Sequence, residues 1–570
     1  MTALTDLLHT AADLYPDQVA VADDQNEVTY TELLTAVAHT AARLRDRVPG
    51  GGPVLLALGP GTGWVTALLG AWHAGNPAVP VDVTHPPKRL RQIAAACAAT
   101  SILTSTGAPP GWADGLTSLA PATSPAPPGA APPQVCADEE TGACIWHTSG
   151  STGVPKPVLV SHRAVAARAA VLPSWSGLTA GDRVAQLTAL TFDAVLWEVL
   201  GALTSGARLQ IASVRDRVPG PALPRFLSRH EINAFTTTPT CLAAAPFTEL
   251  PRLRRIVLGG EELHPRPLER WIGRYDVANA YGPTETCVDA IVAEHVHPGE
   301  DPVPIGRPLP GVRAWILDAH RQPVPAGQAG ELHLGGQGLA TGYLDRSEET
   351  ADAFPLLHLP GVDGEERVYR TGDRVRQRPD GQYVFLGRVD GRLNIGGVRL
   401  EPAEVERAAA RLSGVRTAVL LTGQAGSGRP RLVLHVETDD PGLGPRLRAQ
   451  LADRLPPTAV PALITAHSSL PRTASGKIDR VALARTACAP DTAVRGPVLP
   501  EDVAGWWREQ TGAEAGAARD FFAAGGDSLG ALLLLQLVNE TYGAEITLDA
   551  FYTDPTPRFL SAILTSGSTP

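Results

Sequence analysis

Lysine occurs at only three positions, Lys88, Lys156 and Lys477, in a sequence that otherwise uses arginine for its positive charge. A lysine ammonium is a compact point charge that the broad guanidinium of arginine does not imitate. Lys156 also closes a run of small residues, 148–153, whose backbone N–H groups and hydroxyls could surround phosphate oxygens. These features are compatible with a phosphate site, although chance explains the scarcity of lysine equally well and a run of small residues alone is more often a flexible turn.

The spacing of this loop argues against a common class of phosphate site. A Walker loop requires G-x-x-x-x-G-K-[ST], and residues 148–156 do not contain that pattern, so a conventional P-loop ATPase is a poor fit. The formal net charge of −10, with no basic footprint, argues against a nucleic-acid partner. We therefore expect a small ligand.

The elements around the loop predict an α/β fold. An apolar strand at 143–147 precedes it and a helical pattern at 162–172 follows it. Further strands alternate with helical segments, which predicts mixed sheets. These strands are expected at 255–258, 314–317 and 331–334, with a smaller α+β unit of short strands and helices at 398–485.

Length and composition indicate several domains. A chain of 570 residues exceeds what one hydrophobic core usually serves. Residues 486–500 are predicted to be a linker, and the roughly 70 residues after it have the size of a small helical bundle. The six cysteines lack C-x-x-C spacing, which argues against a zinc site and a disulfide framework. With no membrane-length apolar run and no secretory signal, we expect a cytoplasmic protein.

Several motifs follow one another in a specific order. The main ones are Asn279-Ala-Tyr-Gly-Pro-Thr-Glu285, Tyr369-Arg-Thr-Gly-Asp373, Gly387-Arg-Val-Asp390 and Leu470-Pro-Arg-Thr-Ala-Ser-Gly-Lys477, supported by Val28-Thr-Tyr-Thr-Glu-Leu33, Phe192-Asp193 and Pro304-Ile-Gly-Arg-Pro308. Together they resemble the core motifs of the adenylate-forming superfamily, in particular the adenylation domains of nonribosomal peptide synthetases. The segment Asp520-Phe-Phe-Ala-Ala-Gly-Gly-Asp-Ser-Leu529 resembles the phosphopantetheine attachment motif of peptidyl carrier proteins.

The resemblance implies a multidomain α/β organisation. A large N-terminal subdomain with mixed sheets and a β-barrel-like part is expected at 1–389, and a small α+β subdomain at 390–485. The linker at 486–500 is then followed by a four-helix-bundle carrier domain at 501–570. Asp390 matches the hinge about which the small subdomain rotates.

The implied reaction is ATP-dependent activation of an α-amino acid as aminoacyl-AMP, followed by transfer to a phosphopantetheine thiol on Ser528. ATP, Mg²⁺ and 4′-phosphopantetheine are the implied cofactors, and antibiotic or related secondary metabolism is the implied context. Lys477 would bridge the substrate carboxylate and the nucleotide as the catalytic residue, and Glu285 would hold Mg²⁺. Asp373 would accept both ribose hydroxyls with help from Arg388.

Further residues complete the expected nucleotide site, where Tyr281 would stack on adenine and Thr284 would reach the α-phosphate. The full ATP-binding set is Thr148, Ser149, Gly150, Ser151, Thr152, Gly153, Lys156, Gly260, Glu261, Asn279, Ala280, Tyr281, Gly282, Thr284, Asp373, Phe385, Arg388 and Lys477.

The resemblance also gives an amino-acid pocket of Asp193, Ala194, Trp197, Thr236, Val257, Gly259, Ala280, Val288 and Asp289. Asp193 would pair with the α-ammonium, since an unpaired buried charge is costly. Asp289 brings a second carboxylate to the side-chain end. A side chain with a hydrogen-bond donor, such as that of glutamine, histidine, tyrosine or arginine, would suit it, unless Asp289 turns outward.

Two departures from the family pattern stand out. Asn394 occupies a position where the family commonly has lysine, with Gly396 in place of an arginine, which would slow thioester formation. Pro157 replaces a usual glycine after Lys156.

The expected partners are an α-amino acid, a phosphopantetheinyl transferase, a tailoring enzyme or condensation domain acting in trans, and an MbtH-like helper protein as a further candidate. Neither nucleic acid nor membrane is expected. Two alternatives stay open: an acid:CoA ligase-like enzyme with a carrier domain, and a catalytically silent scaffold.

Overall fold

The computed structural model describes residues 4–566, except 49, 123–138, 149–154, 390–392, 396–397, 425–429, 441–442, 473–477, 487–498, 516–519 and 523. The described residues form two compact units. The first comprises nearly all of the described positions up to 389, and the second comprises those from 393 onward.

The largest sheet of the first unit is mixed. In its described part it runs β15 (Arg307–Pro308), β14 (Ile291–Ala293), β13 (Asp276–Tyr281), β12 (Arg255–Gly259), β11 (Ala234–Thr237), β9 (Arg183–Gln186), β10 (Arg208–Ile211), β1 (Val19–Ala22) and β2 (Glu27–Thr29). The strands from β13 to β1 are parallel, whereas β14, β15 and β2 pair antiparallel at the edges. The inner strands are nearly continuous buried runs, as is typical of parallel strands covered on both faces.

A second mixed sheet carries the loop that ends at Lys156. Its order is β18 (Gly342–Tyr343), β8 (Lys156–Ser161), β7 (Gly142–Thr148), β4 (Ala78–Pro80), β3 (Val54–Ala57), β5 (Ser101–Thr104) and β6 (Thr117–Leu119). A third sheet of the first unit is antiparallel. It comprises β16 (Val312–Leu317), β17 (Ala329–Gly336), β20 (Glu365–Gln377), β19 (Leu356–His358) and β21 (Tyr383–Arg388). The predicted mixed sheets are confirmed.

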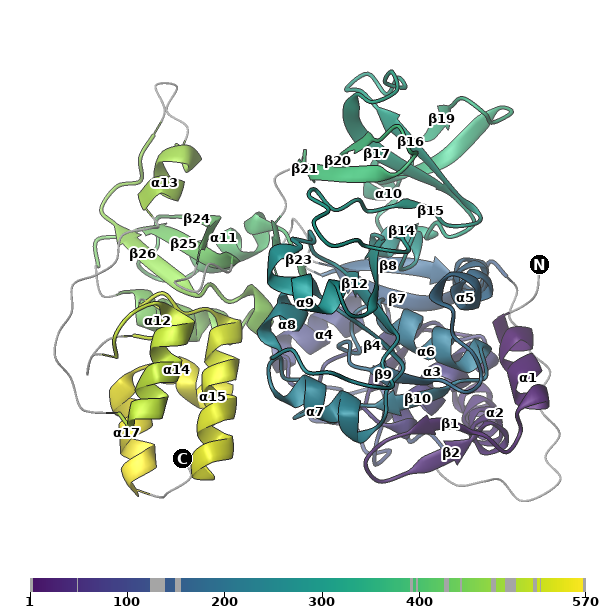
Figure 1. Cartoon of the computed structure of the whole chain (residues 1–570), viewed down its shortest axis with the longest axis horizontal. Helices are drawn as coiled ribbons and strands as arrows, with labels where there is room; N and C mark the ends of the chain where they lie inside the picture. The colour runs from purple at the N-terminus through teal and green to yellow at the C-terminus, as the bar shows by residue number, and fades with distance from the viewer. Residues whose placement is uncertain are drawn as a thin grey trace. The chain divides into compact units, whose positions relative to one another are not determined.

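The helices of the first unit cover these sheets, and α5 and α6 pack against each other (Figure 1). Their bounds are α1 (Leu4–Leu14), α2 (Tyr30–Arg47), α3 (Thr62–Ala74), α4 (Pro87–Ala96), α5 (His162–Ser176), α6 (Val195–Thr204), α7 (Ala222–Arg229), α8 (Pro239–Ala244), α9 (Glu269–Ile272) and α10 (Ser347–Ala353). The predicted helix at 162–172 is α5, which continues through Pro173 for four more residues.

A capping box explains one supporting motif, Val28 to Leu33. The side chain of Thr29 accepts a hydrogen bond from the backbone N–H of Glu32, and the Glu32 carboxylate accepts one from the backbone N–H of Thr29 at 2.9 Å. Two free donors at the start of α2 are thereby satisfied. The motif therefore fixes where a long helix begins.

The second unit begins with a small α+β part. Strand β24 (Thr417–Gln424) pairs antiparallel with β25 (Pro430–Glu437), and β26 (Leu463–His467) pairs parallel with β25. The accompanying elements are β22 (Leu393–Ile395), β23 (Val398–Leu400), α11 (Pro402–Ala410), α12 (Leu443–Ala452) and α13 (Arg480–Thr486). The short strands and helices predicted for 398–485 are confirmed in the described part of this range.

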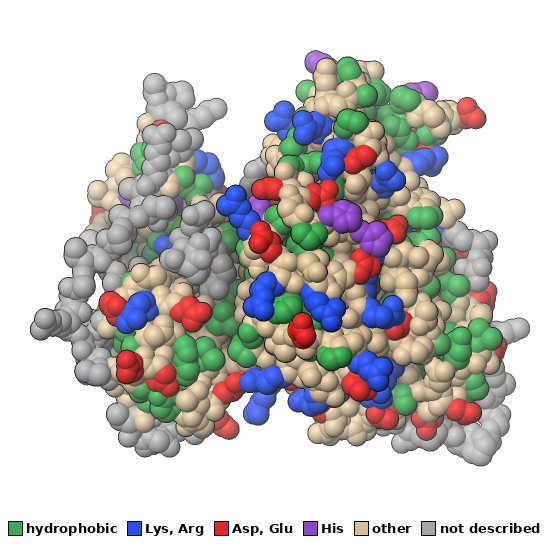
Figure 2. Space-filling model, viewed as in Figure 1, with side chains coloured by type: hydrophobic (Ala, Val, Ile, Leu, Met, Phe, Trp, Pro, Cys, Tyr) green, Lys and Arg blue, Asp and Glu red, His purple; other side chains and the backbone are tan. Residues whose placement is uncertain are grey.

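Helices follow in the last part of the chain: α14 (Glu501–Thr511), α15 (Ser528–Tyr542), α16 (Leu548–Thr553) and α17 (Pro557–Ser566). Trp507, Phe521, Phe522 and Phe551 are fully buried between them. The predicted helical carrier region is confirmed. None of the helices in the described residues combines the length and apolar composition that crossing a bilayer requires. On the face drawn in Figure 2, basic and acidic side chains are interspersed.

Candidate functional site

Asp373, Arg388 and Tyr281 form one polar network in the first unit. Asp373 on β20 lies opposite Arg388 on β21 in the strand register. Arg388 donates to Oδ1 of Asp373 at 2.5 Å and to the backbone oxygen of Thr371 at 3.1 Å. The hydroxyl of Tyr281, at the end of β13, donates to Oδ2 of the same carboxylate at 2.5 Å. The structure thus brings together three residues that the sequence assigned to one nucleotide site.

Glu285 is buried beside the strand that begins with Lys156. Its Oε1 accepts a hydrogen bond from the hydroxyl of Tyr343 at 2.8 Å. The ammonium of Lys156 lies 4.3 Å from the centroid of the Tyr343 ring and 2.8 Å from Oε2 of Glu349. One aromatic side chain therefore connects the expected metal ligand with the expected phosphate-binding lysine.

The remaining nucleotide candidates take varied positions. Asn279 is buried and donates to the backbone oxygen of Pro304 at 2.8 Å. Oε2 of Glu261 accepts from the backbone N–H of Thr240, in the first turn of α8, at 2.9 Å. Half-buried Phe385 and Tyr281 pack against the same apolar cluster. The other described candidates are Gly260, with a left-handed φ of 80°, exposed Gly282, and Thr284, in the 3₁₀ turn Thr284–Thr286.

Several candidates lie outside the described residues. Thr148 and Lys156 are opposite each other at the ends of β7 and β8, and the loop between them is among the residues not described. This applies to Ser149, Gly150, Ser151, Thr152, Gly153, Asp390 and Lys477, and to the side chain of Asn394.

Strand register positions most of the amino-acid pocket. Thr236 on β11 lies opposite Val257 on β12, and its hydroxyl donates to the backbone oxygen of Val257 at 3.1 Å. Gly259 lies opposite Ala280 on β13. A Cβ atom at Gly259 would be 3.0 Å from the backbone oxygen of Ala280, so the close approach of the two strands favours glycine.

Glu198 fixes a turn that precedes Asp193 in the chain. It lies fully buried on α6, and Oε1 accepts hydrogen bonds from the backbone N–H groups of Leu187 and Thr188, each at 2.9 Å. Burial raises the pKa of Glu198 to about 7. Asp193 and Ala194 follow this turn at the start of α6, and Trp197 is buried one turn later.

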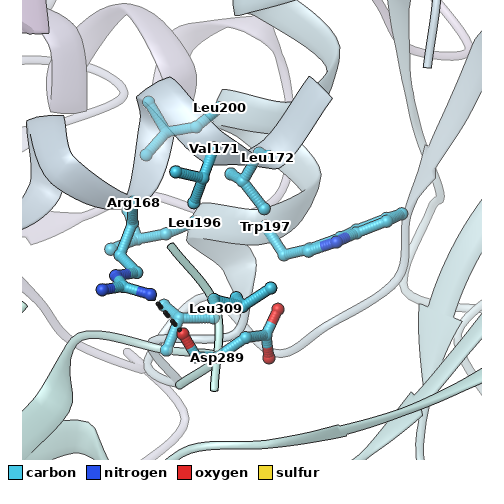
Figure 3. A pocket seen from close by; sticks show the side chains of 9 residues that line it. Arg168, Val171, Leu172, Leu196, Trp197, Leu200, Asp289 and Leu309 are labelled. Carbon is cyan, nitrogen blue, oxygen red and sulfur yellow. Dashed lines mark hydrogen bonds between the residues drawn. The ribbon is translucent and has the colours of Figure 1, made fainter. Parts of the chain in front are cut away.

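Asp289 and Arg168 lie on one side of a small cavity between α5 and α6 (Figure 3). Its lining residues are Arg168, Val171, Leu172, Leu196, Trp197, Leu200, Val288, Asp289 and Leu309. Nη1 of Arg168 donates to the backbone oxygen of Asp289 at 3.0 Å. Burial, and then the nearby charge of Asp193, raise the pKa of Asp289 to about 7, against the opposing effect of Arg168.

The backbone before Asp289 is strained. Cys287 and Val288 adopt left-handed φ values of 58° and 66°, which a β-branched residue rarely takes. The turn is packed against Gly282, where a Cβ atom would lie 1.5 Å from the backbone oxygen of Val288. The unfavourable backbone conformation of Cys287 and Val288 therefore directs this segment toward the pocket.

Ser528 is the first residue of α15 in the carrier region. Asp527 caps the helix, because its side chain accepts a hydrogen bond from the backbone N–H of Gly530 at 2.6 Å. Gly526 fits closely under Phe521, whose ring a Cβ atom would approach to 2.2 Å. The glycine and the aspartate thus fix the backbone that presents position 528.

The described residues are compatible with the expected cofactors. They include no group of three or more His, Cys, Asp or Glu side chains that could hold a metal alone. Mg²⁺ commonly uses one or two carboxylates together with substrate phosphates, so a single buried Glu285 is suited to that mode. A bound magnesium–ATP would supply the activated phosphate, and the Asp373 network would orient the ribose.

Comparison with known proteins decides the family. A family model described as AMP-binding enzyme matches residues 8–344, and one described as phosphopantetheine attachment site matches residues 501–564. The chain belongs to the AMP-binding enzymes. Its adenylation and carrier domains are of the nonribosomal peptide synthetase type, and their cofactors are ATP, Mg²⁺ and 4′-phosphopantetheine. A carrier domain also implies a phosphopantetheinyl transferase as partner.

The relatives of this AMP-binding enzyme include a peptide synthetase and a lipopeptide synthase, both longer than this chain. Phosphinothricin tripeptide synthetase PhsC of Streptomyces viridochromogenes is 35% identical over 96% of this chain and 52% of its own length. Isonitrile lipopeptide synthase of Mycobacterium tuberculosis is 35% identical over 96% of this chain and 22% of its own length. The chain therefore spans about half or less of these relatives. The structure of holo-PA1221, which contains adenylation and carrier domains, superposes with a TM-score of 0.82 at 26% identity and covers 100% of this chain and 97% of PA1221.

Sequence reasoning missed two residues that the structure places at the site. Arg168 occurs in an alanine-rich helical pattern, where an arginine reads as a solvent-exposed side chain, yet it is only 3% exposed. Glu349 follows another glutamate in a polar segment, and nothing in the sequence pairs it with Lys156, 193 positions earlier. For Arg168 the missing information was which face of the helix is turned inward, and for Glu349 it was which distant segments lie side by side.

Proposed function

We propose that the chain activates an α-amino acid with ATP and transfers the aminoacyl group to a phosphopantetheine thiol on its own Ser528. The observation that carries the proposal is that one chain combines the Tyr281–Asp373–Arg388 network with a serine at the start of a capped carrier helix. The first feature suits a nucleotide and the second suits a tethered acyl group. Together they support activation followed by loading.

The residues divide into four functional groups in this proposal. Asp373 and Arg388 bind the ribose, Glu285 holds Mg²⁺, and Lys477 bridges the substrate carboxylate and the α-phosphate. Such catalysis consists mainly of positioning and charge stabilisation. Asp193 receives the α-ammonium of the substrate, which favours an α-amino acid over an aryl or fatty acid.

The domain boundaries are part of the same proposal. The large subdomain occupies 1–389, the small subdomain 390–485, the linker 486–500 and the carrier domain 501–570. Asp390 is the hinge that lets one chain perform the two half-reactions in turn. The aminoacyl thioester is then used in the cytoplasm by a condensation domain or tailoring enzyme acting in trans, and an MbtH-like protein assists folding or activity.

Intact-protein mass spectrometry tests the proposal. The full chain, phosphopantetheinylated at Ser528, is incubated with ATP, Mg²⁺ and pools of amino acids, and its mass is measured. We expect an increment equal to one aminoacyl group. Ser528→Ala should remove the increment and keep amino-acid-dependent ATP–pyrophosphate exchange, whereas Lys477→Ala should remove both. If no amino acid supports exchange or loading, even with an MbtH-like protein, the proposal is wrong.

A further inference from the structure

Arg168 is a buried cation at the side-chain end of the pocket. The residue is 3% exposed and comes from α5, whereas Asp289 comes from the turn after the strained Val288. A Cβ atom at Gly338 would lie 2.9 Å from Nη2 and 3.0 Å from Nε of Arg168, so the guanidinium is enclosed closely. A buried guanidinium needs a counter-charge, because desolvating an unpaired ion is costly.

Asp289 is placed to supply that counter-charge. Nη1 of Arg168 donates a hydrogen bond to the backbone oxygen of Asp289 at 3.0 Å, and the guanidinium also interacts electrostatically with the Asp289 carboxyl group. Figure 3 shows the guanidinium on one side of the Asp289 main chain and the carboxylate on the other, below Trp197. Oδ2 of Asp289 has no hydrogen-bond partner among the described residues. The positive charge of Arg168 therefore offsets part of the negative charge of the Asp289 carboxylate, and Oδ2 is still available to accept a hydrogen bond.

The charges around a bound amino acid then determine what side chain fits. Asp193 is neutralised by the α-ammonium in the proposed function, and Arg168 already supplies a positive charge next to Asp289. A cationic side chain would bring a second positive charge into a small cavity whose other walls include Leu172, Leu196 and Leu200. At short range in such surroundings, charges of the same sign repel strongly. A hydrocarbon side chain would leave Oδ2 of Asp289 without a donor.

We infer that Arg168 is a specificity-determining residue that makes the pocket select a neutral side chain with a hydrogen-bond donor for Asp289, and reject cationic side chains. The class includes carboxamides, ureides and phenols. The inference rests on the proposed function and narrows its substrate. A carboxylate alone would favour arginine and other substrates with cationic side chains. Such substrates are excluded because the guanidinium of Arg168 already lies beside Asp289.

ATP–pyrophosphate exchange by the wild-type chain tests the predicted preference for neutral side chains with a donor group. The full chain is assayed with the twenty common amino acids, citrulline and ornithine, each at the same concentration. Citrulline and arginine are matched in size and differ in charge. We expect the preferred substrate to be neutral with a donor group, and citrulline to exceed arginine at least tenfold wherever either is accepted. A preferred cation or a preferred hydrocarbon side chain would overturn the inference.

Variants then test whether Arg168 is responsible. Arg168→Leu and the longer Arg168→Met should each lower the ratio of exchange with the preferred substrate to exchange with arginine by at least tenfold. Asp289→Asn should raise the ratio of exchange with the preferred substrate to exchange with arginine. It should also increase exchange with glutamate. Arg163→Leu is the matched control, since Arg163 is on the same helix, its side chain is 40% exposed and it pairs with Glu140 at 2.5 Å. It should leave all ratios unchanged.

The outcomes separate the two proposals. One outcome is that both Arg168 variants catalyse exchange with a ratio of preferred substrate to arginine within twofold of the wild type. That result would overturn the role of Arg168 and leave the proposed function standing. Absence of exchange with every amino acid would overturn both. If Arg168→Leu fails to fold, Arg168→Met and the wild-type comparison of citrulline with arginine still decide the question.

Discussion

Tyr281 and Arg388 bind opposite oxygens of the Asp373 carboxylate, each at 2.5 Å. Asp373 is 2% exposed, so this geometry is held by protein atoms rather than by bulk water. The two donors come from different sheets, β13 and β21. The network therefore joins the large mixed sheet to the antiparallel sheet at the point where we propose that ribose binds.

Asp373→Asn should impair ATP use more than Tyr281→Phe. The first change removes a charge and leaves the guanidinium of Arg388 without its ion-pair partner, whereas the second removes one hydrogen bond of about 1 kcal/mol. We expect the KM for ATP in pyrophosphate exchange to rise at least tenfold for Asp373→Asn and about fivefold for Tyr281→Phe. Equal effects of the two variants would contradict a special role for the carboxylate.

Glu285→Gln should raise the Mg²⁺ concentration required for half-maximal exchange by at least tenfold. A neutral amide is a weaker ligand for a hard cation than a carboxylate. Tyr343→Phe removes the 2.8 Å hydrogen bond that orients Glu285, so it should shift the same concentration in the same direction by a few fold. The measurement is a Mg²⁺ titration at saturating ATP. If excess Mg²⁺ does not restore activity to Glu285→Gln, a metal role for this residue is wrong.

The sequence predicted elements better than it predicted contacts. Strands such as β12 and β25 are short, apolar and bounded by turn residues, so local pattern was sufficient to place them. The pairing of Lys156 with Glu349 depends on strand β18 lying beside β8, which no local pattern encodes.

Burial was the harder property to predict at charged positions. Arginine is mostly exposed in proteins, so the residue type predicts an exposed side chain at position 168. Arg168 is instead only 3% exposed. The ordered motifs identified Asp289 as a pocket residue through resemblance. They could not show that a cation on α5 already sits beside it, because that contact joins residues 121 positions apart.

Gly526→Ala should destabilise the carrier domain. The added methyl would lie 2.2 Å from the ring of Phe521, which is fully buried and packs edge-on against Trp507 with ring centroids 5.1 Å apart. Overpacking of this kind costs about 1–3 kcal/mol. We expect hydrogen exchange of the α15 amides in the full chain to quicken by about ten- to a hundredfold.

Gly505→Ala is the matched control for that experiment. Gly505 lies inside α14, and a Cβ atom there would meet nothing within 4 Å. Alanine is the better helix former by about 1 kcal/mol, so exchange in α14 should slow rather than quicken. Faster exchange in both variants would show that the carrier domain responds to any added methyl, and the close fit at Gly526 would lose its support.

Asp289 should make the stability of the first unit depend on pH. Its pKa is about 7 in the folded chain, above the ordinary value of 3.8, so the folded state binds a proton more tightly than the unfolded state. The free energy of unfolding must therefore fall as pH rises between these two values and level off above pH 7. Because the residue is half-buried, we expect a slope well below the limit of about 1.4 kcal/mol per pH unit.

Denaturant unfolding of the wild type and Asp289→Asn at several pH values from 4.5 to 8 measures this contribution as a difference. Glu198, whose pKa is also raised, is present in both proteins and largely cancels. The stability of the wild type relative to the variant should decline up to pH 7. Arg168→Leu removes the charge that lowers the pKa of Asp289, so in that background the decline should extend to higher pH. A difference that does not change with pH would mean that the Asp289 carboxyl is solvated and faces away from the pocket.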